Sequence, residues 1–279
     1  MICIYHNDMD GKCAAAVVHY AHQDKEITFI DANYNRPFPW KEVKDQDVVI
    51  VDFSIQPYED MKKLKECTKS LVWIDHHKSA IEYAEKADFN IDGIQEAHKG
   101  AGCELTWEYY FKNKEIPIAI EYIGDYDTWK FAFGEKTKRF NSGLYIQDTN
   151  PLSKFWYFLF NDMRDERLIR TIMRDGDTIN LYNTQRYESC VKHSTYEIEL
   201  CGFKGLACNY YQSGSLLFKS IPDLYEKYQF VCVYYYNGKI WTASVYTERK
   251  DVDVSLIATH YGGGGHFGAG GFQCKELPF

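Results

Sequence analysis

The sequence predicts an α/β protein with an N-terminal, mainly parallel sheet flanked by helices, joined by further helices to a smaller C-terminal mixed α/β domain. In the first half, near-continuous apolar runs alternate with helical patterns, which is typical of a parallel sheet covered on both faces. Strand patterns disappear near residue 150 and return near residue 196. A chain of 279 residues with 45% hydrophobic content is long enough for two such domains.

The first domain, residues 1–150, opens with a strand, a loop and a helix. The apolar run "MICIYH" predicts the strand, and the alanine-rich "KCAAAVVHYAHQ" favours the helix. Strands and helices are then predicted in turn at "DVVIVDF" (47–53), "YEDMKKLKEC" (58–67), "SLVWID" (70–75) and "AGCELTWEYYF" (101–111). The apolar segment "IAIEYIGDYDTW" (118–129) follows, which we treat as a strand that ends at "YIG".

Residues 151–195 have helical character with mixed charge, and we expect them to form the back of the first domain and a connector. The second domain, residues 196–279, begins with strand patterns and contains a hairpin turn at Asn237-Gly238. A helix candidate, "DVSLIATHY" (253–261), precedes the glycine-rich "GGGGHFGAGGF" (262–272).

Composition excludes several classes of protein. The net charge of −8 argues against coating long nucleic acid, because such binding depends on many Lys and Arg contacts to phosphate. The nine scattered cysteines form no CxxC pair, so they indicate neither a disulfide scaffold nor a thiolate zinc site. The sequence has neither a long uncharged apolar run nor a signal-peptide pattern, so we expect a cytoplasmic protein that does not bind membranes.

Acids and imidazoles follow the predicted strands, where functional groups gather in an open parallel sheet. They are His6, Asp8, Asp10, Asp52, Asp75, His76, His77, Asp125 and Asp127. One aspartate at a strand end is usually a cap or turn residue. Several adjacent carboxylates would repel one another unless cations bridge them, and mixed imidazole and carboxylate ligands suit Mn²⁺, Zn²⁺ or Fe²⁺. The sequence therefore predicts a site for two metal ions.

The glycine-rich segment provides a second candidate site. Consecutive amides at Gly262, Gly263, Gly264 and Gly265 can approach an anion closely, and His266 can donate to a phosphate or stack on a base. A flexible tail is the alternative, but the position after a predicted helix favours an ordered loop.

With these motifs in order, the whole chain resembles the DHH phosphoesterases. The resemblance rests on "HNDMDG" (6–11), "VDFS" (51–54), "DHH" (75–77), "GDYDTW" (124–129) and the glycine-rich segment, which resembles that of the DHH-associated C-terminal domain. The branch of oligoribonucleases and cyclic-nucleotide phosphodiesterases is the most similar. The resemblance implies a catalytic core in the first domain, substrate binding by the second, and an active site in the cleft between them.

The resemblance also implies a role for each site residue. His6 and Asp8 would bind one Mn²⁺, Asp10 and His76 the other, and Asp52 would bridge both; Mg²⁺ or Co²⁺ could replace Mn²⁺. We prefer Asp125 over Asp127 as the last ligand, because Asp125 would emerge first from a strand ending at "YIG". His77 would face the scissile phosphate, and Asp75 would orient a neighbouring imidazole. Arg249 or Lys250 would supply the basic residue that family members use for the substrate's far end.

The expected activity is hydrolysis of short oligonucleotides, one nucleotide at a time, by a hydroxide that bridges the two metals. Phosphoadenosine phosphate, cyclic mono- or dinucleotides and single-stranded DNA are alternative substrates for the same chemistry. A sensor that binds nucleotides without turnover is the alternative from another class, but it would not need a full set of metal ligands. The sequence leaves the oligomeric state open, a homodimer included.

Overall fold

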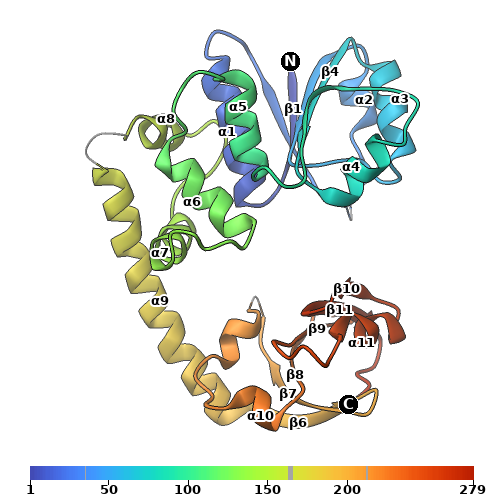
Figure 1. Cartoon of the computed structure of the whole chain (residues 1–279), viewed down its shortest axis with the longest axis vertical. Coiled ribbons are helices and arrows are strands. Elements are labelled where there is room, and N and C mark those ends of the chain that lie inside the picture. Colours follow the sequence, from blue (N-terminus) through green and yellow to red (C-terminus); the bar gives the residue numbers. More distant parts are fainter. Residues whose placement is uncertain (35, 163–165, 212) are drawn as a thin grey trace. The chain divides into compact units, whose positions relative to one another are not determined.

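The computed structural model describes residues 1–34, 36–162, 166–211 and 213–279 of the chain (Figure 1). These divide into two compact units, Met1–Ile179 and Asn180–Phe279. The boundary falls inside the long helix α9 (Arg167–Ser194). None of the helices in the described ranges is long and apolar enough to cross a membrane.

Unit 1 contains a five-stranded sheet in the order β2-β1-β3-β4-β5, with every pairing parallel. The strands are β1 (Ile2–His6), β2 (Thr28–Ala32), β3 (Asp47–Val51), β4 (Ser70–Asp75) and β5 (Asp92–Gln95). The predicted parallel sheet is confirmed, and the three apolar runs form its three central strands. The two edge strands were not predicted.

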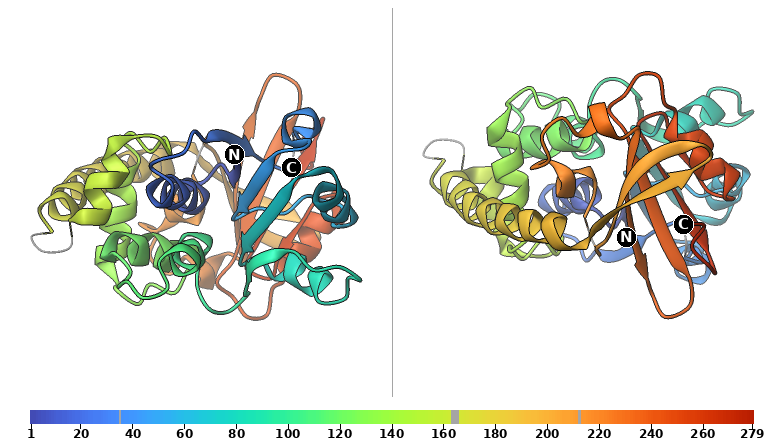
Figure 2. Two further views of the ribbon diagram at one scale, coloured as in Figure 1. Left: turned by 90° about the horizontal axis from the view of Figure 1, so that it is seen from above. Right: turned by 90° about the horizontal axis from the view of Figure 1, so that it is seen from below.

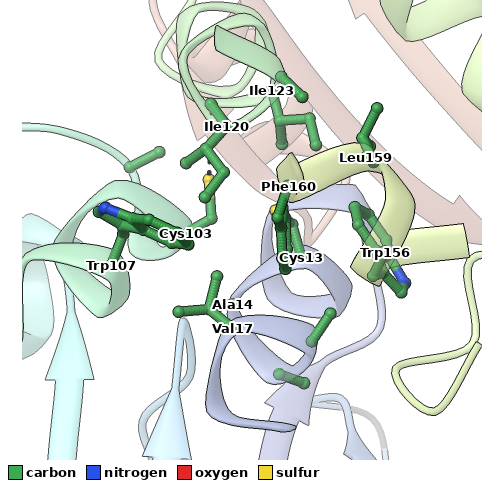
Figure 3. Packing of buried hydrophobic residues seen from close by; sticks show 14 of the residues in the cluster. Cys13, Ala14, Val17, Cys103, Trp107, Ile120, Ile123, Trp156, Leu159 and Phe160 are labelled. Carbon is green, nitrogen blue, oxygen red and sulfur yellow. Dashed lines mark hydrogen bonds between the residues drawn. The ribbon is translucent and has the colours of Figure 1, made fainter. Parts of the chain in front are cut away.

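Helices cover both faces of this sheet, as expected for buried parallel strands (Figures 1 and 2). They are α1 (Met9–Ala21), α2 (Trp40–Val43), α3 (Glu59–Cys67), α4 (Lys78–Ala84), α5 (Gly102–Tyr110), α6 (Ile118–Asp127), α7 (Glu135–Leu144), α8 (Lys154–Asn161) and the first part of α9. Alternate side chains of β1 point to opposite faces of the sheet. Cys3 and Tyr5 pack with α1, α5, α6 and α8, whereas Ile2 and Ile4 pack with α2 and α3. Figure 3 shows the first of these clusters, where Cys13 on α1 and Trp156 on α8 meet side chains of α5 and α6.

The segment 118–127 is helix α6, so our treatment of it as a strand was wrong. Pro117 occupies the N-cap position, where its missing amide hydrogen has no cost. Ala119, Ile120 and Ile123 are buried together against α1 and α5, at the spacing of one helical face.

Unit 2 contains a six-stranded mixed sheet in the order β10-β11-β9-β8-β7-β6, in which only the pair β7–β8 is parallel among the described strands. Its elements are β6 (Thr195–Leu200), β7 (Phe203–Asn209), the 3₁₀ turn η1 (Ser215–Phe218), α10 (Leu224–Lys227), β8 (Phe230–Tyr236), β9 (Trp241–Tyr246), α11 (Val254–His260), β10 (Gly264–His266) and β11 (Ala269–Cys274). The predicted hairpin joins β8 to β9, with Gly238 at a φ of 89°. The glycine-rich segment forms the hairpin β10–β11.

Candidate metal centre

The strand register of unit 1 brings the predicted site residues to one edge of the sheet. Tyr5 pairs with Val51, and Val51 pairs with Ile74. His6, Asp52 and Asp75 each follow directly, so they lie at the same level on three adjacent strands. Side chains at this edge form three overlapping groups that could hold a metal ion, with the ligand atoms of each group within 4.8 Å of one another, and Asp75 is in none of the three.

The first group consists of His6, Asp8 and Asp52. His6 Nδ1 lies 2.7 Å from an Asp8 oxygen and 3.7 Å from an Asp52 oxygen. Asp8 is also the N-cap of α1, where its other oxygen accepts a hydrogen bond from the Gly11 amide at 2.9 Å. Glycine is required at position 11 because a Cβ there would lie 2.2 Å from the His6 carbonyl oxygen.

The second group consists of Asp10, His76 and Asp127. His76 Nε2 lies 3.5 Å from Asp10 and 3.4 Å from Asp127. The Asp10 carboxylate is buried at the start of α5, where the Gly102 amide donates to Oδ2 at 2.7 Å and the Cys103 amide donates to Oδ1 at 2.8 Å. These two amides fix the carboxylate plane, so α5 positions a residue that belongs to α1.

Asp52 connects the two groups. It has an unusual positive φ of 53°, and its Oδ1 lies 3.2 Å from His76 Nε2. Its buried Oδ2, on the side of His6, has no hydrogen-bond partner among the residues that the structure describes. A buried carboxylate oxygen without a partner is costly unless a cation is bound. The donor set therefore fits two divalent cations that share Asp52.

The electrostatics of this cluster also favour a cation. Burial, and then the charges of Asp52 and Asp127, raises the pKa of Asp10 well above its ordinary value. Burial likewise raises the pKa of Asp52 and of Asp127. The carboxylates of Asp52 and Asp8 raise the pKa of His6 to about 10. The cluster therefore retains protons that bound metal ions would displace.

The third group consists of Asp52, His76 and His77, and His77 is also paired with Asp75. Asp75 is fully buried, and its Oδ1 accepts hydrogen bonds from the His76 and His77 amides at 2.8 and 3.1 Å. The same oxygen lies 2.7 Å from His77 Nδ1. Burial opposes protonation of His77, but Asp75 and Asp52 outweigh it and raise the pKa of His77 to about 9.

The structure places Asp127 in the cluster, and not Asp125 as we had preferred. Asp125 is buried on α6, where its carboxylate accepts hydrogen bonds from the Ala132 amide at 2.7 Å, the Phe133 amide at 3.2 Å and the Thr137 hydroxyl. Burial opposes ionisation, but these hydrogen bonds hold the pKa of Asp125 below its usual range. Asp125 therefore organises the loop that follows α6.

The predicted substrate-binding residues of unit 2 differ from one another in exposure and in contacts. His266 and Gly264 are exposed on β10, which is an edge strand of the sheet. Glycine is required at Gly263 and Gly265 for close packing, since a Cβ would lie 2.0 Å from the Gly271 carbonyl oxygen and 2.4 Å from that of Ala269. The guanidinium group of Arg249 is bonded to both oxygens of Asp251 and to the Tyr225 carbonyl group, and Lys250 is exposed.

The backbone donors at Gly102 and Cys103 were not predicted from the sequence. The only signal was the "AGCE" start of a predicted helix, where unpaired amides can bind a carboxylate.

Comparison with known proteins identifies relatives of the chain. The family described as "DHH family, N-terminal domain" matches residues 1–124. The chain is 27% identical over 249 residues to the uncharacterized protein R106 of Acanthamoeba polyphaga mimivirus, a match that covers 85% of this chain and 56% of R106. It is 25% identical over 299 residues to the oligoribonuclease NrnB of Bacillus subtilis (strain 168), covering 97% of this chain and 72% of NrnB.

Solved structures share the fold. The pGpG-specific phosphodiesterase PggH of Vibrio cholerae superposes with a TM-score of 0.55 at 12% identity, covering 98% of this chain and 93% of PggH. RecJ of Thermus thermophilus, in complex with Mn²⁺, superposes with a TM-score of 0.51 at 13% identity, covering 98% of this chain and 49% of RecJ.

Proposed function

Because residues 1–124 match the N-terminal domain of the DHH family, we propose that the chain is a metal-dependent phosphodiesterase that hydrolyses short oligonucleotides. The observation that carries the proposal is the pair of ligand groups connected by the buried carboxylate of Asp52, whose Oδ2 has no hydrogen-bond partner among the described residues. The substrate class is supported by the relatives, since NrnB is named an oligoribonuclease and PggH a pGpG-specific phosphodiesterase.

Two divalent cations would be held by the chain's own residues. His6, Asp8 and Asp52 would hold one, and Asp10, His76 and Asp127 the other, with Asp52 shared. Bound cations of this kind polarise phosphoryl oxygens and make water a stronger nucleophile. Mn²⁺ is the proposed ion because imidazole and carboxylate donors suit it and because the similar RecJ structure is a complex with Mn²⁺.

His77 would act on the leaving group. Because its Nδ1 faces Asp75, its Nε2 is the ring nitrogen that can reach substrate. The hydrogen bond with Asp75 favours the protonated ring, so His77 would donate a proton to the departing oxygen. Asp75 fixes the ring and stabilises its charge.

Unit 2 would bind the rest of the substrate. The edge strand β10, which contains Gly264 and Gly265, has one side without a strand partner among the described residues, so its outward-facing amides and the exposed His266 could bind a phosphate group. Arg249 is already paired with Asp251, so we propose that it stabilises the local conformation of unit 2.

The test is a substrate panel of short RNA, cyclic dinucleotides, phosphoadenosine phosphate and single-stranded DNA, each with Mn²⁺, Mg²⁺ or Co²⁺, with products resolved by size. We expect Mn²⁺-dependent product from short RNA, none from Asp52→Ala, and native rates from Asp24→Ala, which removes an exposed carboxylate. Tight binding of all substrates without product would instead indicate a nucleotide sensor.

A further inference from the structure

The loop that follows α6, residues 128–133, contains an aromatic side chain that stability alone does not explain. Trp129 is 64% exposed and has a φ of 57°. Phe131, two residues later, has a φ of 50°. A positive φ is strained for a bulky residue, and tryptophan is normally buried. The loop therefore combines two unfavourable features at one residue.

Asp125 holds the loop in this conformation. Its backbone carbonyl group accepts hydrogen bonds from the Lys130 and Phe131 amides at 3.2 and 3.5 Å. Its carboxylate accepts the bonds from Ala132 and Phe133 described above, so one buried residue binds four consecutive amides. Backbone strain that is held in place by the surrounding structure is characteristic of binding sites.

The rings around Trp129 leave it able to accept a stacking partner. Phe131 meets it at a centroid distance of 4.7 Å and an angle of 68°, and Tyr126 at 5.5 Å and 69°. Both contacts are edge-to-face, so neither ring stacks parallel to the indole. These contacts orient the indole.

The loop also begins beside the candidate metal centre. Asp127, whose carboxylate lies 3.4 Å from His76, is two residues before Trp129. Two residues span at most about 7.2 Å between Cα atoms. The backbone of Trp129 therefore lies close to the place where a phosphate would bind, and we infer that its exposed side chain can reach the attached nucleoside.

We propose that Trp129 forms a nucleobase-binding subsite. The base of the nucleoside attached to the scissile phosphate stacks on the indole. The proposal rests on the proposed phosphodiesterase function and adds to it a determinant of substrate choice. Stacking accepts any base because each has a π-face, so the subsite would distinguish nucleotides from other phosphodiesters without selecting a sequence.

Variants at position 129 separate this role from a structural one. Glycine adopts a positive φ without strain, so Trp129→Gly should keep a melting temperature close to the native value. It should lower kcat/KM for a dinucleotide by about 5-fold to 150-fold, mainly through KM, since stacking contributes roughly 1–3 kcal/mol per base. Trp129→Phe should retain most of the native value. Tyr145→Ala, which removes a 72% exposed ring at the other end of α7, is the matched control and should behave as native.

The decisive comparison uses a dinucleotide analogue that lacks both bases. Native protein and Trp129→Gly should cleave the abasic analogue at equal rates. An equal loss of cleavage activity on both substrates, or a loss that accompanies a lowered melting temperature, would overturn the proposal of a nucleobase-binding subsite.

Binding of adenosine monophosphate, which has no phosphodiester bond to cleave, by the native protein with Mn²⁺ tests the stacking without turnover. We expect quenching of tryptophan fluorescence that is absent from Trp129→Phe protein. If native protein cleaves no substrate of the panel, the proposed function fails, while quenching through Trp129 would still support the subsite. No difference in quenching between the two proteins would refute it.

Discussion

Gly102→Ala should damage the metal centre without unfolding the protein. Gly102 begins α5, and its amide donates to Asp10. A Cβ at position 102 would lie 2.7 Å from Asp52 Cβ and 3.0 Å from Asp10 Oδ2. Carbon atoms in contact normally stand about 3.5–4.0 Å apart, so one or both carboxylates would have to move by about 1 Å.

The expected magnitudes differ for stability and for metal binding. Overpacking of this kind costs about 1–3 kcal/mol, and alanine in place of glycine in a helix returns up to about 1 kcal/mol. The net loss in the free energy of unfolding is therefore at most about 3 kcal/mol, or roughly 10 °C in melting temperature. Disturbing the groups that orient a metal ligand typically lowers metal affinity about 10-fold to 100-fold.

Calorimetric titration with Mn²⁺, together with thermal unfolding, measures both quantities. Gly214→Ala is the matched control, because its added Cβ would meet its nearest neighbour, the Tyr246 hydroxyl, at an ordinary 3.6 Å. Native Mn²⁺ affinity in a folded Gly102→Ala protein would refute the idea that the start of α5 positions the two carboxylates.

Three further outcomes follow from the same geometry. Asp127→Asn should lower Mn²⁺ affinity at least about tenfold by calorimetry while leaving the metal-free melting temperature unchanged or raised, because it removes a charge near Asp10; unchanged affinity would exclude it as a ligand. Asp125→Ala should lower the free energy of unfolding in urea by at least about 2 kcal/mol, because the buried site leaves amide donors unpaired; native stability would contradict this. The raised pKa of Asp10 means that the metal-free fold binds more protons than the unfolded chain, so stability falls as pH rises above the ordinary aspartate value. Mn²⁺ should therefore raise the melting temperature more at pH 8 than at pH 5.5, and equal shifts would contradict the proton displacement.

The central strands and the residues at their ends could be predicted from the sequence because those strands are buried on both faces. Such strands become near-continuous apolar runs, and the acids that follow them stand out. The edge strands β2 and β5 could not be predicted, since "TFIDA" and "DGIQ" are partly exposed and contain charged residues. A strand covered on one side only has no continuous apolar run to identify it.

The choice between Asp125 and Asp127 depended on the type of secondary structure, which the apolar segment "IAIEYIG" did not determine. In a strand, residues two apart face the same side, so both acids could have approached the metal centre. In a helix they are rotated by about 200°, and only one can reach His76. The other points into the protein, where it holds the loop that follows. Loss of activity alone would not distinguish these roles, because either substitution disturbs the site. Metal affinity and unfolding free energy do distinguish them, since Asp127 should affect the first and Asp125 the second.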